Sequence, residues 1–210
     1  MTCPTRRAVL AGLAAGLAAP ALAQADRWGG ALEAARSLPQ LHAVLVAVNG
    51  ETVLAEAVRG PGLEAPANVK SVSKSIVALL LGAAVDRGVV PSVEATLGVV
   101  APSLVPSGAD PRVAALTLEN LVTLRAGLER TSGPEYGAWV SSSDWVADAL
   151  SRPFVAEPGG RMLYSTGSFH VLGAALSEAS GESLLALARS WLGDPLGIEV
   201  APWTRDPQGY

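Results

Sequence analysis

Ser71 and Lys74 form the pattern Ser-x-x-Lys, whose residue types could carry out nucleophilic chemistry. Lys74 is one of only two lysines in the chain, and the pattern lies where a loop enters the long apolar segment 71–87. Because residues i and i+3 share one face of a helix, the Ser71 hydroxyl and the Lys74 amine can meet. Burial would lower the pKa of this amine and allow it to accept the serine proton. The alternative, equally open on the local sequence, is that Ser71 only caps a helix and Lys74 is solvated.

Tyr164 is a second candidate for chemistry, in the segment YSTG (164–167). Here a short extended stretch follows the turn EPGG (157–160) and leads into a helix. A tyrosine at this point could face the same cleft as Ser71. It would then relay a proton between the nucleophile and the leaving group, with Lys74 lowering its pKa. Taken alone, Tyr164 is more simply interpreted as a half-buried structural residue.

The order and spacing of four motifs resemble those of serine hydrolases of the β-lactamase and penicillin-binding-protein family, over about residues 41–200. The class C-like branch is the most similar, with its esterases, D-amino-acid peptidases and 6-aminohexanoate-dimer-hydrolase-like amidases. The motifs are SVSKS (71–75), LENLVTLRAGL (118–128), EPGGRMLYSTGSFHVLG (157–173) and DPLGI (194–198).

This resemblance implies an α/β fold of the α+β type, the β-lactamase-like fold, with a helical subdomain and an antiparallel sheet. It implies that Ser71 is the acylated nucleophile, that Lys74 is its base or pKa tuner and that Tyr164 is the proton relay. The amide N–H of Ser71 would be one oxyanion donor. We expect a small-molecule ester, amide or peptide as substrate, and no cofactor.

The sequence departs from the branch at Thr166, where the pattern Tyr-x-Asn usually has its asparagine. That asparagine bonds the amide side chain of β-lactam-type substrates. Its replacement disfavours a β-lactamase and favours an esterase or amidase with a different acyl pocket, in which Thr166 is the candidate substrate-binding residue. A second departure, LRAGL (124–128) in place of His-Thr-Ser-Gly-Leu, lies at a site that is more structural than chemical.

The family's third motif, Lys-Thr-Gly or His-x-Gly on a late strand, is absent from the sequence. In the family it supplies the second oxyanion amide. The strands that would complete a sheet over a hairpin at 41–58 are also missing. We therefore expect residues 26–210 to be an incomplete, C-terminally truncated hydrolase domain with little activity. The alternative function is a non-catalytic member that at most binds, or is slowly acylated by, β-lactam or peptidoglycan-like ligands.

Other catalytic chemistries have weaker support. A Ser-His-Asp hydrolase would need an elbow of the type Gly-x-Ser-x-Gly, which does not occur. His42 alternates with apolar residues in an expected strand and His170 lies in an expected apolar helix, so both are interpreted as packed structural residues without an evident partner. No metalloprotease, phosphate-loop or dinucleotide signature is present.

Residues 1–25 have the features of an export signal: a basic start, an apolar stretch and small residues at the cleavage point. Arg6 and Arg7 resemble the twin-arginine address. Cleavage would follow Ala23 or Ala25, and the protein would be periplasmic or secreted.

A membrane anchor is the alternative for this segment. The apolar run 8–23 is short, rich in Ala and Gly, and interrupted by Pro20, which is weak for a membrane span. We therefore expect no stable span after signal removal. Cys3 would leave with the signal, so the rest of the chain would fold without disulfides.

The composition excludes several classes of protein. Half of the residues are hydrophobic and 16% are charged, which is typical of a globular chain and not of a disordered one. The net charge is −4 and no segment is strongly basic, so nucleic acid is not an expected partner. One cysteine and two histidines leave no ligand set for a structural zinc.

Apolar periodicity and breaker residues predict the elements that must position these residues. Asn49-Gly50 between two apolar runs predicts a β-hairpin, and Thr117 is a candidate N-cap. The predicted strands are 41–48 and 51–58; the predicted helices are 28–38, 71–87, 118–125, 144–152, 169–180 and 183–192; segments 59–70, 88–116 and 128–142 are predicted to be mainly irregular.

Overall fold

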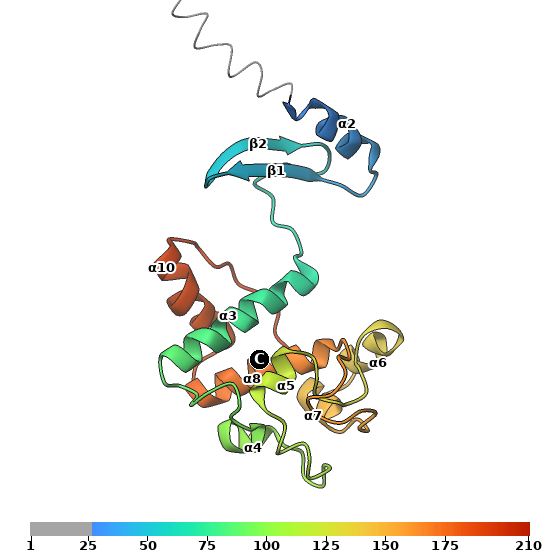
Figure 1. Cartoon of the computed structure of the whole chain (residues 1–210), viewed down its shortest axis with the longest axis vertical. Coiled ribbons are helices and arrows are strands. Elements are labelled where there is room, and N and C mark those ends of the chain that lie inside the picture. The colour runs from blue at the N-terminus through green and yellow to red at the C-terminus, as the bar shows by residue number, and fades with distance from the viewer. Residues whose placement is uncertain (1–26) are drawn as a thin grey trace, which may run out of the picture. The chain divides into compact units, whose positions relative to one another are not determined.

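The computed structural model describes residues 27–210, so the expected export signal lies outside the described residues. The chain divides into two compact units, one ending at Asn68 and the other comprising Val69–Tyr210. Both strands belong to the first unit, and the second unit is built from helices and the loops between them (Figure 1).

The first unit contains the helix α2 (Gly29–Ser37) and the antiparallel strands β1 (Ala43–Val48) and β2 (Glu51–Ala57). Asn49 and Gly50 both have positive φ angles, 53° and 83°, as a two-residue turn of type I′ requires. The predicted hairpin is therefore confirmed. Its register shifts once, between Val46 and Ala47.

Arg59 connects α2 to the hairpin inside this unit. Its guanidinium donates hydrogen bonds to the carbonyls of Arg36 (2.8 Å), Leu38 and Leu41 (3.3 Å). His42 holds the other end of the hairpin through its carbonyl, which accepts from the amides of Val58 and Arg59. The interpretation of His42 as a packed residue was wrong, because its side chain is exposed at a strand end.

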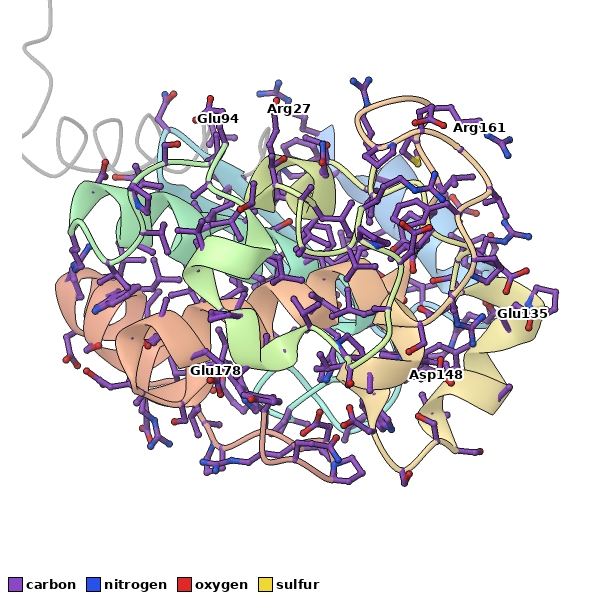
Figure 2. The ribbon with its side chains drawn as sticks, turned by 90° about the horizontal axis from the view of Figure 1, so that it is seen from below. Arg27, Glu94, Glu135, Asp148, Arg161 and Glu178 are labelled. Carbon is purple, nitrogen blue, oxygen red and sulfur yellow. The ribbon has the colours of Figure 1, made fainter. Side chains whose placement is uncertain are left out.

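The second unit is organised around α8 (Thr166–Ser180), against which α3 (Ser73–Asp86), α5 (Leu118–Val122) and α7 (Trp145–Leu150) pack (Figure 1). α8 is apolar on nearly every side, with Val171, Leu172 and the run Ala174–Leu176 buried, because neighbours surround it. It ends at Gly181, whose φ of 71° gives the left-handed C-cap that glycine adopts without strain. The charged residues Glu94, Glu135, Arg161 and Glu178 lie on the outside of this unit (Figure 2).

Short helices and turns complete the second unit. They are η1 (Lys70–Val72), α4 (Leu97–Val100), η2 (Pro102–Leu104), α5 (Leu118–Val122), η3 (Gly133–Glu135), α6 (Tyr136–Val140), α7 (Trp145–Leu150), α9 (Leu184–Ala188), the π-helical turn η4 (Arg189–Gly193) and α10 (Asp194–Leu196).

Several predicted boundaries change. Thr117 is confirmed as an N-cap and forms a capping box with Asn120, but α5 ends at Val122 because Leu124 takes a left-handed φ of 60°. The segment 128–142, predicted to be irregular, contains α6. α8 begins at Thr166, three residues earlier than predicted.

The apolar segment that forms α3 is less buried than predicted. Leu80, Leu81 and Ala84 are buried, whereas Val72 and Leu79 are 65% and 57% exposed. The apolar segment 71–87 thus forms a core helix on one side only, because only that side of α3 packs against the other helices.

No single helix in residues 27–210 has the length and apolar content needed to cross a membrane. α8 and residues 184–196 meet these criteria only as a pair, with a bend of 85° between them.

Candidate active site

The structure brings Ser71 and Lys74 together at the start of α3. Ser71 lies in the 3₁₀ turn η1, and Lys74 is the second residue of the helix that follows. The Lys74 Nζ atom donates a hydrogen bond of 3.2 Å to Ser71 Oγ. Ser71 is exposed, so its hydroxyl is open to a ligand from solution. A serine hydroxyl in contact with an amine is the pair needed for nucleophilic attack on a carbonyl.

The turn that presents Ser71 has its own local cause. Lys70 adopts a left-handed φ of 48°, which directs the chain sharply into η1. The Ser73 hydroxyl donates to the Lys70 carbonyl at 2.8 Å, and the Val72 amide donates to the Val69 carbonyl at 3.0 Å. These two bonds keep Ser71 ahead of α3 and on the same side as Lys74.

Lys74 is half-buried, which lies between the two open alternatives of a buried amine and a solvated one. Its ammonium group lies over two aromatic rings, 5.2 Å from the ring centre of Tyr164 and 5.8 Å from that of Phe169. Such cation–π contacts attract an ammonium group to the ring faces. The immediate partners of Lys74 are thus a hydroxyl and two rings.

Tyr164 lies beside this pair, with 40% of its surface exposed. A hydrogen bond with the Ser71 hydroxyl holds the pKa of Tyr164 below its ordinary value. Burial is the next largest influence on this pKa and acts to raise it, whereas the positive charge of Lys74 adds to the lowering. Ser71, Lys74 and Tyr164, separated by up to 93 residues in the sequence, therefore meet at one point of the helical unit.

The segment LRAGL (124–128) positions Tyr164 through the backbone. The amides of Val155, Gly159 and Leu163 donate to the carbonyls of this segment, each at 2.8 Å. Gly127 has a φ of 80°, and a Cβ atom there would collide with the Ala156 carbonyl. The segment thus acts as a template for the loop that leads to Tyr164, in agreement with its structural interpretation.

Two residues that the sequence did not single out, Thr131 and Ser132, cap the start of α8. The Gly167 amide donates to Thr131 Oγ1 at 2.7 Å, and the Thr166 amide donates to Ser132 Oγ at 2.9 Å. Thr131 also contacts the Ser165 hydroxyl through its own amide and its hydroxyl. These bonds fix the helix directly after Tyr164. No local pattern marks Thr131 and Ser132, because they lie more than thirty residues away from their partners.

Thr166 contacts Ser132 and also lines a cavity. Its hydroxyl forms a 2.9 Å hydrogen bond with the Ser132 hydroxyl, and its side chain lines a cavity of about 200 Å³ in the second unit. Lys74 lines the same cavity from α3. Aromatic rings form much of the remaining wall: Tyr136, Trp139, Trp145, Phe169 and His170.

His170 has a partner that the sequence did not reveal. Its Nε2 atom lies 2.8 Å from Asp206 Oδ2, and the Asp206 side chain is fully buried. The other carboxylate oxygen of Asp206 accepts the amides of Gln208, Gly209 and Tyr210. The expectation that His170 lacks a partner was therefore wrong, whereas its packing between other side chains is as expected. Within residues 27–210, no three His, Cys, Asp or Glu side chains gather where a metal ion could bind.

The beta-lactamase family profile matches residues 18–209, and the chain belongs to this family. No curated protein sequence matches the chain.

Solved structures show the same fold. The chain is similar to EstCE1, "a hydrolase with promiscuous acyltransferase activity" (21% identity, TM-score 0.68), covering 86% of this chain and 53% of that one. It is similar to SurE (23% identity, TM-score 0.62; 88% and 41% covered). It is also similar to the simvastatin synthase LovD from Aspergillus terreus (21% identity, TM-score 0.59; 86% and 53% covered).

The expected β-lactamase-like fold is thus confirmed, with a helical subdomain and an antiparallel sheet that has two strands among the described residues. The chain spans about half the length of these solved structures, or less.

Proposed function

We propose that this chain is a serine hydrolase of the beta-lactamase family that forms an acyl-enzyme at Ser71 and cleaves an ester or amide bond. The observation that carries the proposal is the 3.2 Å hydrogen bond from Lys74 Nζ to Ser71 Oγ, beside Tyr164 with its lowered pKa. A nucleophile, a cation and a phenol that ionises more easily than usual are the groups that acyl transfer requires.

The first half of the reaction forms the acyl-enzyme. Ser71 Oγ attacks the carbonyl carbon, and the hydroxyl proton passes to the Tyr164 oxygen. The carbonyl oxygen becomes an oxyanion that accepts from the amide N–H of Ser71. When the carbonyl re-forms, the bond to the leaving group breaks and Tyr164 returns the proton to that group. Lys74 stabilises the Tyr164 phenolate and orients Ser71, so it acts as the pKa tuner.

The second half releases the acid. A water molecule gives a proton to the Tyr164 phenolate and attacks the acyl carbon. When the intermediate collapses, the bond to Ser71 Oγ breaks and Tyr164 returns the proton to that oxygen, which restores the Ser71 hydroxyl and the phenolate. The sequence lacks the motif that supplies a second oxyanion amide in the family. Because one missing oxyanion donor lowers the rate by about 10²–10³-fold, we expect slow turnover by residues 1–210 alone.

A fluorophosphonate probe tests the nucleophile. Intact-mass analysis of the full chain should show one adduct, which Ser71→Ala abolishes. Ser75→Ala is the matched control, because Ser75 is an exposed serine one turn further along and should leave labelling unchanged. Labelling that persists in Ser71→Ala would exclude Ser71 as the nucleophile. Cleavage of p-nitrophenyl esters, measured on the same three proteins, then separates turnover from labelling.

A non-catalytic binder is the second candidate. It is favoured by Thr166, which replaces the usual asparagine and whose hydroxyl already pairs with Ser132. This candidate predicts that a penicillin probe forms an adduct that persists for hours without product release. Rapid loss of that adduct with release of hydrolysed penicillin would contradict it.

The expected export of the protein is a separate proposal. We propose that residues 1–25 are a twin-arginine-type signal and that residues 26–210 remain after cleavage. The test is N-terminal sequencing of the exported protein, with Arg6→Lys/Arg7→Lys as the variant that should block export. An exported protein that begins at Met1 would contradict signal cleavage.

A further inference from the structure

We propose that the 200 Å³ cavity beside α3 and α8 binds an aromatic carboxylate, and that this is the acid part of the substrate cleaved at Ser71. Support for the binding of the carboxylate comes only from the size, walls and charge of the cavity. Its identity as the acyl group rests on the proposed function. The cavity lies wholly within the second unit, between residues of α3, α6, α7, α8 and α9.

The size of the cavity selects the ligand. An engineered cavity of about 150 Å³ lined by apolar side chains binds benzene. A space of about 200 Å³ therefore accommodates a phenyl ring with a short alkyl chain. A long acyl chain or a bicyclic β-lactam with its side chain would extend out of it.

The walls favour a flat ring. The indole N–H of Trp139 donates to the Trp145 carbonyl at 2.9 Å, and that of Trp145 donates to the Val140 carbonyl at 3.1 Å. Both indole donors are thus occupied, and the rings present apolar surface to the cavity. The His170 ring lies 5.7 Å and 5.4 Å from the centres of these two rings. Aromatic groups at such spacing add edge and face contacts to a bound ring.

The walls are also held in place before any ligand arrives. Asp206 fixes the His170 ring through the 2.8 Å contact with Nε2. Trp139 is 1% exposed and packs at 5.1 Å from Trp145, so neither ring can turn away freely. Binding to a preorganised site loses less side-chain entropy than binding that must order its walls.

The charge of the cavity selects an anion. Lys74 is the charged residue in the lining, and the lining contains no aspartate or glutamate. Asp206 lies behind His170, with no exposed side-chain surface and with its oxygens engaged. The Thr166 hydroxyl at the wall can also donate to a carboxylate when the Ser132 hydroxyl is the donor in the pair between them.

One side chain joins this cavity to the candidate nucleophile. Lys74 lines the cavity, and its Nζ atom lies 3.2 Å from Ser71 Oγ. A ligand with its ring against Trp139 and Trp145 can place its carboxyl carbon near Lys74. That carbon then lies close to Ser71, because Lys74 itself contacts the Ser71 hydroxyl. The same position suits the free acid and the acyl group of an ester.

The test measures binding of 3-phenylpropanoate to the full chain by calorimetry, with quenching of tryptophan fluorescence as the second signal. Val77→Phe places a ring in the cavity from α3 and should weaken binding at least tenfold. Val99→Phe, the same change at a residue of α4 that is 73% exposed, is the matched control and should bind as the wild type does. If circular dichroism shows that Val77→Phe does not fold, Val77→Leu replaces it as the test variant.

Two further ligands test the reason for binding. Acetate lacks the ring and 3-phenylpropanamide lacks the charge, so each should bind at least tenfold more weakly than 3-phenylpropanoate. Equal binding of 3-phenylpropanoate to wild type and Val77→Phe, or equal binding of acetate, would overturn the proposal.

Ser71→Ala separates this inference from the proposed hydrolase. The variant should still bind 3-phenylpropanoate while cleavage of p-nitrophenyl 3-phenylpropanoate is lost. Cleavage that continues in Ser71→Ala would refute Ser71 as the nucleophile. It would not affect the proposed binding of the carboxylate in the cavity. In the wild type, the phenylpropanoate ester should react at least tenfold faster than the acetate ester, and Val77→Phe should remove that preference. Cleavage with no such preference, alongside normal binding of the acid, would refute the acyl-group assignment.

Discussion

Thr131→Val probes the contact that fixes the start of α8, and hence the position of Tyr164. Thr131 is 1% exposed, and its hydroxyl accepts the Gly167 amide at 2.7 Å and contacts the Ser165 hydroxyl at 3.2 Å. Valine has nearly the same shape as threonine, so the substitution leaves no void. It removes one oxygen and leaves the Gly167 N–H without its partner.

The expected cost follows from this one lost acceptor. A buried donor left unsatisfied costs about 1–3 kcal/mol, and loss of a helix cap costs about 0.5–2 kcal/mol. Both figures describe the same lost contact, so we expect the free energy of unfolding to fall by about 2 kcal/mol. With a urea m-value of about 1–3 kcal/mol/M, the midpoint should fall by about 1 M.

The assay is urea unfolding of the full chain followed by tryptophan fluorescence. Thr123→Val is the matched control, since Thr123 is exposed and its hydroxyl only donates back to the Glu119 carbonyl within α5. It should change the free energy of unfolding by less than about 0.5 kcal/mol. Acylation of Ser71 should also slow in Thr131→Val, because Tyr164 directly precedes the affected helix start.

A Thr131→Val protein as stable as the Thr123→Val control would refute this reasoning. It would mean that the Gly167 amide finds another acceptor and that the Thr131 hydroxyl does not hold the helix start. An unchanged midpoint with a changed m-value would point instead to an altered unfolded state.

Three further predictions concern the same unit. Gly127→Ala should lower the thermal midpoint strongly, because its Cβ would meet the Ala156 carbonyl at a φ of 80°; calorimetry with stability close to wild type would contradict this. In absorbance titrations at 295 nm, Ser71→Ala should raise the pKa of Tyr164, because the lost hydrogen bond is the main cause of its lowering. Burial, with help from Glu178, raises the pKa of Tyr210 to about 12. The folded state therefore favours the protonated phenol, and its contribution to stability is full below pH 10 and lost as the pH rises through about 12. Tyr210→Phe should remove that part of the alkaline loss, and identical stability curves for the two proteins between pH 10 and 12 would contradict it.

The sequence by itself determined the features that depend on neighbours along the chain. Asn49-Gly50 specified the hairpin because the turn needs two positive φ angles. Thr117 specified a helix start because its hydroxyl reaches an amide three residues on. Ser71 and Lys74 were predicted to meet for the same reason, since a separation of three residues is one helical turn. The order of the motifs was sufficient for the family.

Tertiary structure decided the features that depend on residues far apart in the chain. The start of α8 at Thr166 depends on hydroxyls of Thr131 and Ser132, and the setting of His170 depends on Asp206. The exposure of Ser71 and the half-burial of Lys74 depend on which side of α3 meets the helical core. Hydrophobic patterning shows that a helix is apolar, but it does not show which neighbouring elements cover the helix. The cavity beside Lys74 arises where side chains from several helices fail to fill space, and this is a property of packing that no local pattern carries.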